Sequence, residues 1–278
     1  MLVAPAMAIG SGYYRPLVEE IRARGWEAET LPRRGHEADG VRASRAHDWG
    51  YADEIDEMAA AVARRRAAEE DRPVLLLGHS MGGQMAVGHQ LTRDPADGLV
   101  LVGASLPHHV LYPRRGPGIV ALAALVPAVT ALVGHHPRPL FGGPGGRTLM
   151  REWAWMALTG RPPYRTGRGL GGPVLSVTLE GDRMAPERAN RVLATRWAGD
   201  AARVTHWTYR TRDVPEGGSN DHVRWVRSPG PVVDRLVAWW EAARAGGAER
   251  PDAAATGHPA GAQPRKPTAP TLGEPIST

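Results

Sequence analysis

The chain has 278 residues, of which 42% are hydrophobic and 23% charged, so it holds enough apolar material for a sizeable core. This composition excludes a wholly disordered or fibrous chain, and one α/β domain with a tail accounts for the length. Cysteine is absent, which excludes disulfide bonds, thiol nucleophiles and cysteine-ligated metal sites. The formal net charge is +5, but the arginines are scattered among acidic residues without an interleaved aromatic stripe, so we do not expect nucleic acid as a partner.

The predicted elements alternate between strands and helices along most of the chain. Continuous apolar runs predict strands buried on both faces, and apolar residues repeated at helical spacing predict helices. The predicted strands are residues 2–6, 26–31, 73–77, 99–102, 174–179 and 203–209. The predicted helices are residues 14–24, 51–66 and 231–244, with a further helical pattern after residue 80. This order predicts a mostly parallel, doubly wound α/β sheet with ligand sites at the carboxyl ends of its strands.

The alternation fails between residues 105 and 172, which we interpret as an insertion over the edge of the sheet. A structureless connection of that length is not expected in a compact domain. The longest apolar run of this segment covers residues 119–133, and it is interrupted by Pro127 and Thr130. It is shorter than the roughly 20 residues that a membrane span needs, so we expect a buried or lid helix there, with membrane contact as the less favoured alternative.

The two ends of the chain differ in composition. Met1 leads directly into an apolar stretch with no basic region before it, so we expect no cleavable signal peptide and a cytoplasmic protein. From residue 246 onward Ala, Gly, Pro and Thr predominate, and large apolar residues are almost absent. Such a segment cannot offset its ordering entropy by burial, so residues 246–278 are predicted to form a disordered tail behind a single domain of residues 1–245.

Residues 75–83 read LLLGHSMGG and fit the pattern G-x-S-x-G directly after a predicted buried strand. A serine hydroxyl is a weak nucleophile, so it has to be presented on a tight strand-to-helix turn where a base can reach it. Side chains at positions 78 and 82 would collide in such a turn, and both residues are glycine. This context favours Ser80 as a nucleophile over a chance Gly-Ser-Gly turn, and we expect the amide of Met81 to face the developing oxyanion.

A serine nucleophile needs a base and an acid, and in this architecture the acid follows the serine in the chain and the histidine comes last. Asp182 lies in the turn after the strand predicted at residues 174–179, so we predict it as the acid, with Glu180 and Asp213 as alternatives. His222 lies in the loop after the last predicted strand, so we predict it as the base.

The other histidines are weaker candidates for the base. His206 lies within a predicted strand, His79 within the serine turn itself, and His36 after an early strand. The pairs at residues 108–109 and 135–136 lie in the insertion, and no Asp or Glu at helical spacing completes a metal site with them. We therefore predict neither a metal ion nor another cofactor.

A second oxyanion donor is expected in the loop after the first strand, where residues 4–8 read APAMA. The backbone amide of Met7 is the predicted donor. An ordinary turn at the end of a strand is the alternative for this segment.

With these residues in place, the chain resembles the α/β-hydrolase superfamily, and within it a branch of hydrolases similar to serine aminopeptidases and esterases. The resemblance covers about residues 1–245. It is carried by the APAM of residues 4–7, the YYRP of residues 13–16, the serine turn at 78–82, Gly181-Asp182, and His222 three residues before Trp225.

The resemblance implies an eight-stranded, mostly parallel sheet with a lid inserted after the sixth strand, where residues 105–172 fall. Members usually begin with an antiparallel hairpin before the first strand found here, so we expect this chain to lack the usual N-terminal strand pair. Ala8 stands where relatives commonly have glycine. The resemblance does not extend to epoxide or haloalkane hydrolases, because those enzymes need a carboxylate where Ser80 stands.

These observations predict a serine hydrolase that cleaves a carboxylic ester through an acyl-enzyme, with amide or thioester cleavage left open. The apolar insertion favours a small-molecule acyl or aryl substrate over a highly charged one. A non-catalytic binding module that keeps the fold is the competing class of function, since a fold alone does not set function. The sequence does not indicate an oligomeric state.

Overall fold

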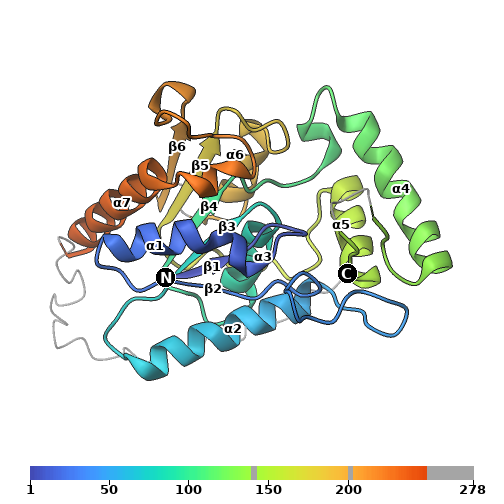
Figure 1. The fold of residues 1–278 in the computed structure, drawn as a ribbon, viewed down its shortest axis with the longest axis horizontal. Coiled ribbons are helices and arrows are strands. Elements are labelled where there is room, and N and C mark those ends of the chain that lie inside the picture. The colour runs from blue at the N-terminus through green and yellow to red at the C-terminus, as the bar shows by residue number, and fades with distance from the viewer. Residues whose placement is uncertain (139–142, 200–202, 249–278) are drawn as a thin grey trace, which may run out of the picture.

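The computed structural model of the chain describes residues 1–138, 143–199 and 203–248, and it describes side chains up to residue 245. Within these residues, six strands form one sheet in the order β2-β1-β3-β4-β5-β6, as Figure 1 shows. The strands are β1 (Leu2–Ala4), β2 (Glu29–Thr30), β3 (Leu75–His79), β4 (Gly98–Val102), β5 (Val174–Leu179) and β6 (Val204–Tyr209). The helices are α1 (Arg15–Ala23), α2 (Tyr51–Ala68), α3 (Met81–Thr92), α4 (Gly116–Val133), α5 (Arg147–Thr159), α6 (Glu187–Thr195) and α7 (Gly230–Ala248).

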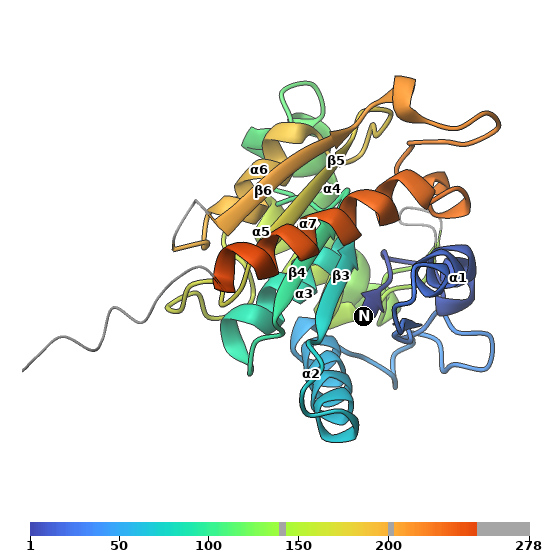
Figure 2. The same ribbon diagram turned by 90° about the vertical axis from the view of Figure 1, so that its left-hand side faces the viewer.

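The sheet is covered on both faces, since every residue of its central strands β3, β4 and β5 is buried and most are apolar. Alternate side chains of a strand point to opposite faces. Leu76, Leu99 and Leu101 pack with residues of α2, α3 and α6, whereas Leu75 and Leu77 pack with residues of α1 and α7. Figure 2 shows α7 crossing in front of the strands on the second of these faces. This is the two-sided burial that the continuous apolar runs predict.

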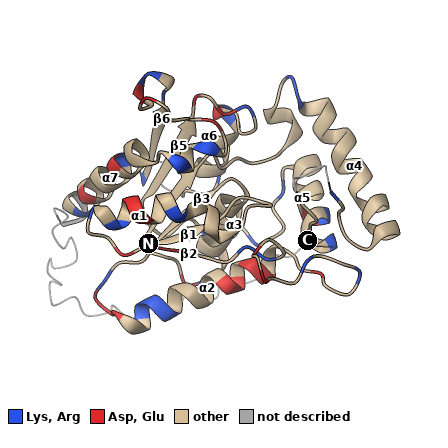
Figure 3. Cartoon of the chain, viewed as in Figure 1, with Lys and Arg blue, Asp and Glu red and all other residues tan. Residues whose placement is uncertain are grey.

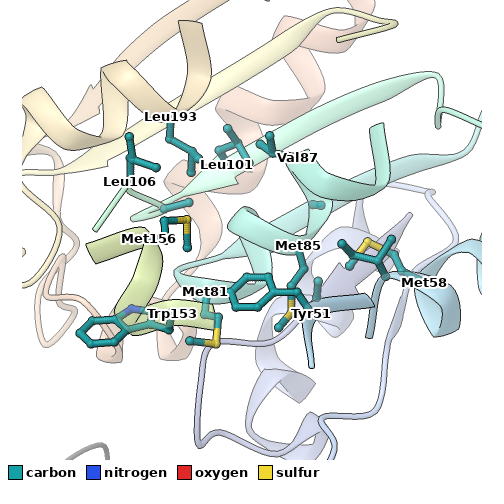
Figure 4. Packing of buried hydrophobic residues seen from close by; sticks show 14 of the residues in the cluster. Tyr51, Met58, Met81, Met85, Val87, Leu101, Leu106, Trp153, Met156 and Leu193 are labelled. Carbon is teal, nitrogen blue, oxygen red and sulfur yellow. The ribbon is translucent and has the colours of Figure 1, made fainter. Parts of the chain in front are cut away.

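The core on the α2 and α3 side continues into the insertion. Tyr51 of α2, Met85 of α3 and two residues of α5, Trp153 and Met156, belong to one buried cluster (Figure 4). Met156 is fully buried. Helix α5 is therefore part of the core, although the sequence pattern predicts no helix at these residues.

Every predicted strand is present, and the observed ends differ from the predicted ones by at most three residues. All pairings are parallel, so the predicted doubly wound sheet is confirmed. Helix α7 continues to Ala248, three residues beyond the predicted end of the domain. The rest of the predicted tail, residues 249–278, lies outside the described residues, and the expected lack of an N-terminal strand pair stays a prediction.

Helix α4 in the insertion differs from the prediction of a buried helix at residues 119–133. It has 18 residues and a mean hydropathy of 2.1, so it is long and apolar enough to cross a membrane, yet only 22% of it is buried. The buried positions, among them Ala123, Val126 and Thr130, are those on the side that packs against α5. The interpretation as a buried helix is therefore wrong, and the alternative of a lid stays a prediction.

Candidate active site

Ser80 lies in the turn between β3 and α3, where the sequence predicts it. Its backbone has φ 55° and ψ −121°, a positive-φ conformation that few residues other than glycine adopt. Its amide donates to the carbonyl of Val102 at 3.1 Å, which ties the turn to the neighbouring strand β4. The turn thus holds the hydroxyl group at the carboxyl edge of the sheet, directly before the positive end of the α3 dipole.

The two glycines of the serine turn are required by close backbone contacts. A Cβ atom at position 78 would lie 2.4 Å from the Cα of Gly83. A Cβ atom at position 82 would lie 2.3 Å from the carbonyl oxygen of Ala4, at the end of β1. The predicted collision at both positions is confirmed, and the second contact shows that the start of α3 lies directly against the loop after β1.

The three predicted side chains, which lie far apart in the sequence, form a hydrogen-bonded series. His222 Nε2 lies 2.9 Å from Ser80 Oγ, and His222 Nδ1 lies 2.6 Å from Asp182 Oδ2. The side chain of Asp182 is fully buried, and that of His222 is 10% exposed. Asp182 follows β5 and His222 follows β6, so the parallel sheet brings both to the edge where β3 ends. In this geometry a carboxylate can orient an imidazole that receives a proton from a hydroxyl group.

The carboxylate of Asp182 is held by two backbone amides as well as by the imidazole. Its Oδ1 accepts hydrogen bonds from Met184 N at 2.6 Å and from Ala185 N at 3.0 Å. These bonds fix the orientation of the carboxylate and leave its other oxygen directed at His222.

The alternative candidates are engaged elsewhere. Glu180 accepts a hydrogen bond from the amide of Thr211 at 2.7 Å, and Asp213 is exposed at the end of the short 3-10 helix Thr211–Asp213. In the insertion, His109 Nδ1 lies 3.1 Å from the carbonyl oxygen of Ala157. Among the residues that the structure describes, no group of three His, Asp or Glu side chains is placed to hold a metal ion.

The loop that carries His222 is organised by the preceding residue. Asp221 Oδ1 accepts hydrogen bonds from the amides of Val223 at 2.9 Å and Arg224 at 2.6 Å. Partial burial acts to raise the pKa of Asp221, but the hydrogen bonds from Arg224 and Val223 outweigh it and lower the pKa to about 2. Asp221 is thus ionised at neutral pH, which keeps the loop in its turn conformation.

His79 is fully buried beside the serine turn, and both of its ring nitrogens have partners. Nδ1 lies 2.7 Å from the hydroxyl oxygen of Tyr14, and Nε2 lies 2.7 Å from the carbonyl oxygen of His222. The Tyr14 hydroxyl also accepts a hydrogen bond from the amide of Ala6 at 2.7 Å. These three contacts are satisfied when Tyr14 donates to Nδ1 and the ring donates from Nε2 to the His222 carbonyl. Trp225 Nε1 also lies 3.3 Å from Nε2, but in this tautomer Nε2 carries the hydrogen and does not accept from it.

This chain of hydrogen bonds joins the loop after β1 to the loop that carries His222. Burial, with a smaller effect of the neighbouring His222 ring, lowers the pKa of His79 to about 3, so the ring is neutral at ordinary pH. A neutral ring accepts at one nitrogen and donates at the other, as these contacts need. His79 is therefore a structural link between two loops of the site and not a base for Ser80.

The two predicted oxyanion donors lie on either side of the serine turn. Met81 is the first residue of α3, and Met7 lies in the loop after β1. Within the described residues the amide of Met7 donates to no acceptor, although the adjacent Ala6 amide is bonded to Tyr14. Ala8 has φ 61°, and among the described residues only it and Ser80 have a positive φ without being glycine. Backbone strain is thus concentrated in the two segments that would hold an oxyanion.

The structure contains a buried ion pair below the site that the sequence analysis does not predict. Arg33 and Glu54 are 2% and 6% exposed, and their Nη1 and Oε2 atoms lie 3.0 Å apart. Arg33 also contacts two methionines of α3, with Nη2 at 2.9 Å from the sulfur of Met81 and Nη1 at 3.1 Å from that of Met85. The sequence signal that could have revealed this pair is the position of Glu54 on the apolar face of α2, because a buried carboxylate needs a cationic partner.

The comparisons with known proteins agree with this architecture. Residues 1–138 match the family described as serine aminopeptidase, S33, a range that contains Ser80 and ends before Asp182 and His222. No curated protein matches the sequence significantly.

Many solved structures share the fold. A monoacylglycerol lipase from Paleococcus ferrophilus is 18% identical with a TM-score of 0.57, and the match covers 85% of this chain and 93% of that one. An esterase from Exiguobacterium antarcticum is 16% identical with a TM-score of 0.52, covering 86% and 90% of the two chains. The pyrethroid hydrolase PytH is 17% identical with a TM-score of 0.57, covering 87% and 96%. At these identities the likeness shows the fold alone.

Proposed function

We propose that the chain, which shares the fold of known hydrolases and matches the serine aminopeptidase family over residues 1–138, is a serine hydrolase that cleaves a carboxylic ester bond through an acyl-enzyme. One observation carries this proposal: the imidazole of His222 lies between the hydroxyl group of Ser80 and the carboxylate of Asp182, within hydrogen-bond distance of both. A binding module has no need for such a series of three groups at the edge where this fold places its ligand sites.

In the proposed reaction the Ser80 hydroxyl oxygen attacks the carbonyl carbon of the ester, and its proton passes to His222 Nε2. Asp182 holds the imidazole in the tautomer that leaves Nε2 free to accept, and it stabilises the imidazolium that forms. The amides of Met7 and Met81 donate to the oxyanion of the tetrahedral intermediate. Collapse of this intermediate expels the alcohol, which takes the proton from His222. In the second half of the reaction a water molecule gives a proton to His222 and attacks the acyl-enzyme. Collapse of the second intermediate releases the acid, and the proton on His222 returns to Ser80.

The substrate is proposed to be a small molecule with an apolar acyl or aryl group. The insertion next to the site contains Leu, Val and Trp side chains. The segment that connects β4 to the insertion contains buried Ala104 and Leu106. Apolar linings of this kind favour apolar ligands over highly charged ones. Amide and thioester bonds remain within the reach of the same chemistry.

A fluorophosphonate probe tests the proposal, because it reacts covalently only with a serine that an adjacent base activates. We expect the probe to label the purified full chain on the peptide that contains Ser80, and we expect the chain to hydrolyse p-nitrophenyl esters of short acids. Ser80→Ala should show neither reaction, with an unchanged circular dichroism spectrum. His222→Ala keeps the serine and should not be labelled at an appreciable rate.

Two results would contradict the proposal. Full esterase activity in Ser80→Ala would show that another group is the nucleophile. Absence of both labelling and turnover in the folded wild-type chain would favour the non-catalytic binding module.

A further inference from the structure

Helix α4 presents an apolar surface to solvent that neither the fold nor the proposed reaction accounts for. Its exposed large side chains include Leu125 (58% exposed), Leu132 (80%) and Val133 (38%), and we call this exposed face the apolar ridge. The helix carries no charged residue along its length, as Figure 3 shows. Exposed apolar surface of this extent on a soluble protein marks a place of interaction.

The charged residues of the segment that carries the apolar ridge have one sign. No Asp or Glu occurs in the sequence from residue 98 to residue 151. Arg114 and Arg115 are exposed directly before the helix, and beyond its end Arg138 is exposed and Arg45 donates to the carbonyl of Leu132 at 2.7 Å. Within the described residues none of these four arginines pairs with a carboxylate, whereas Arg65 and Arg66 at the end of α2 do. Both ends of the ridge therefore carry arginines whose charge no carboxylate of the described residues neutralises.

This pattern distinguishes between the occupants that an apolar helix can have. A second copy of the chain would cover the ridge, but in either direction it would place arginines against arginines with no carboxylate in the segment to offset them. The surface of a bilayer matches both features of this region. Its acyl chains can contact the leucines of the ridge, and its phosphate groups can bind the guanidinium groups of the arginines.

We propose that the apolar ridge docks on the surface of a bilayer with anionic headgroups, with α4 lying in the plane of the interface. The helix is about 27 Å long, which is short of the hydrocarbon thickness, and it contains Pro127. Its inner side packs against α5, so it cannot leave the protein to span the membrane without exposing that side. The sequence favours a buried or lid helix at residues 119–133 and leaves membrane contact as the weaker alternative; the exposure of α4 reverses that preference.

The docked ridge would lie one short segment away from the candidate active site. The chain enters α4 from the loop after β4, where the hydroxyl oxygen of Tyr112 lies 2.8 Å from Ser105 Oγ. Both residues are buried, so this part of the connection is fixed to the body of the protein. The inference does not depend on the proposed hydrolysis, since a protein without catalytic activity would dock in the same way.

Co-sedimentation with sucrose-loaded vesicles tests the inference on the full chain. We expect the chain to sediment with vesicles of phosphatidylcholine and phosphatidylglycerol, to bind pure phosphatidylcholine more weakly, and to lose affinity as salt is added. Leu125→Ser combined with Leu132→Ser should weaken binding by about tenfold or more. Arg114→Gln combined with Arg115→Gln should weaken binding to the anionic vesicles by about 30-fold.

A matched control removes the same charge from another part of the surface. Arg64→Gln combined with Arg188→Gln, two exposed arginines of α2 and α6 that form no ion pair among the described residues, should leave vesicle binding within about twofold of the wild type. Equal loss in this control and in the Arg114/Arg115 variant would show that only net charge matters and would overturn the inference. The inference would also be overturned, in favour of a second copy, if the wild-type chain bound neither type of vesicle and formed a dimer that the two Leu→Ser changes dissociate.

Discussion

The loops that hold the candidate active site and the insertion beside them are stabilised in different ways. Around Ser80 each loop is tied by buried hydrogen bonds to another loop, as in the chain from Ala6 through Tyr14 and His79 to the His222 carbonyl. In the insertion, α4 is attached along one side and exposes the rest. The first region therefore tolerates little change, whereas the second can vary on its outer surface without loss of fold.

The largest effect is expected at the carboxylate that orients the base. Asp182→Asn keeps the shape of the side chain but offers His222 Nδ1 a donor in place of an acceptor, so the imidazole adopts the wrong tautomer. We expect kcat for ester hydrolysis to fall by about 10,000-fold. The control is Asp213→Asn, which changes an exposed carboxylate after the neighbouring strand and should leave kcat unchanged. A fall of less than tenfold in Asp182→Asn would remove this residue from the proposed mechanism.

The buried ion pair below the serine turn should show the next largest effect. Arg33→Met leaves the carboxylate of Glu54 buried without its partner, so we expect the free energy of unfolding to fall by about 3–5 kcal/mol in urea titrations. Burial raises the pKa of Glu54, against the effect of Arg33, so the unpaired carboxyl group becomes protonated more readily in the variant. Adding Glu54→Leu should restore most of the loss, because the second change removes the unpaired group. Equal stability of Arg33→Met and the wild type would show that the pair contributes nothing.

Acid should destabilise the protein through His79. Its pKa is about 3 in the folded state and 6.5 in the unfolded chain, so the unfolded state binds more protons between these values. The contribution of His79 is therefore complete above about pH 6.5, and lowering the pH to about 5 should cost about 2 kcal/mol. His79→Asn should be less stable at neutral pH but lose less on acidification. Burial also lowers the pKa of His36 and His89 to about 4, so part of the slope should persist in the variant. Identical slopes in the two proteins would contradict the buried neutral ring.

The same Ala→Gly change should have opposite signs in the two regions. Ala8→Gly relieves the positive φ of the loop after β1, so we expect it to raise the free energy of unfolding by about 0.5–1 kcal/mol after the added entropy of the unfolded chain is counted. Ala121→Gly, at an exposed position of α4, should lower it by about 1 kcal/mol, because glycine is a poor helix former. A loss of stability in Ala8→Gly would mean that the loop does not hold residue 8 in the left-handed conformation.

The sequence predicts the first region better than the second, and the reason is physical. Strands buried on both faces and the serine turn leave few residue types possible, so the pattern around Ser80 indicates both the structure and the position of the hydroxyl group. The order of strands in a parallel sheet then places Asp182 and His222 at the same edge. Their catalytic roles stay predictions that the expected losses of activity test, and the roles of the Met7 and Met81 amides stay predictions as well.

What the sequence does not reveal depends on contacts between distant residues. The link of Tyr14 to His79 and the pair of Arg33 and Glu54 join residues 65 and 21 positions apart, and neither spacing follows a local period. In the insertion, apolar residues occur on all sides of α4, so periodicity cannot tell a buried helix from an exposed one. Only the packing against α5 decides which side is covered.

The smallest effect is expected on the outer surface of the insertion. Leu132→Ser and Leu125→Ser remove exposed apolar side chains, so each should change the free energy of unfolding by about 0.5 kcal/mol or less in the absence of lipid. The matched change Leu101→Ser, at a position of β4 that is 1% exposed, should cost at least about 3 kcal/mol. If Leu132→Ser were as costly as Leu101→Ser, α4 would be covered in solution by another surface of protein, and the two regions would not differ in the way described here. If it is neutral, these leucines contribute nothing to the fold, and the function of the apolar ridge has to lie in what it binds.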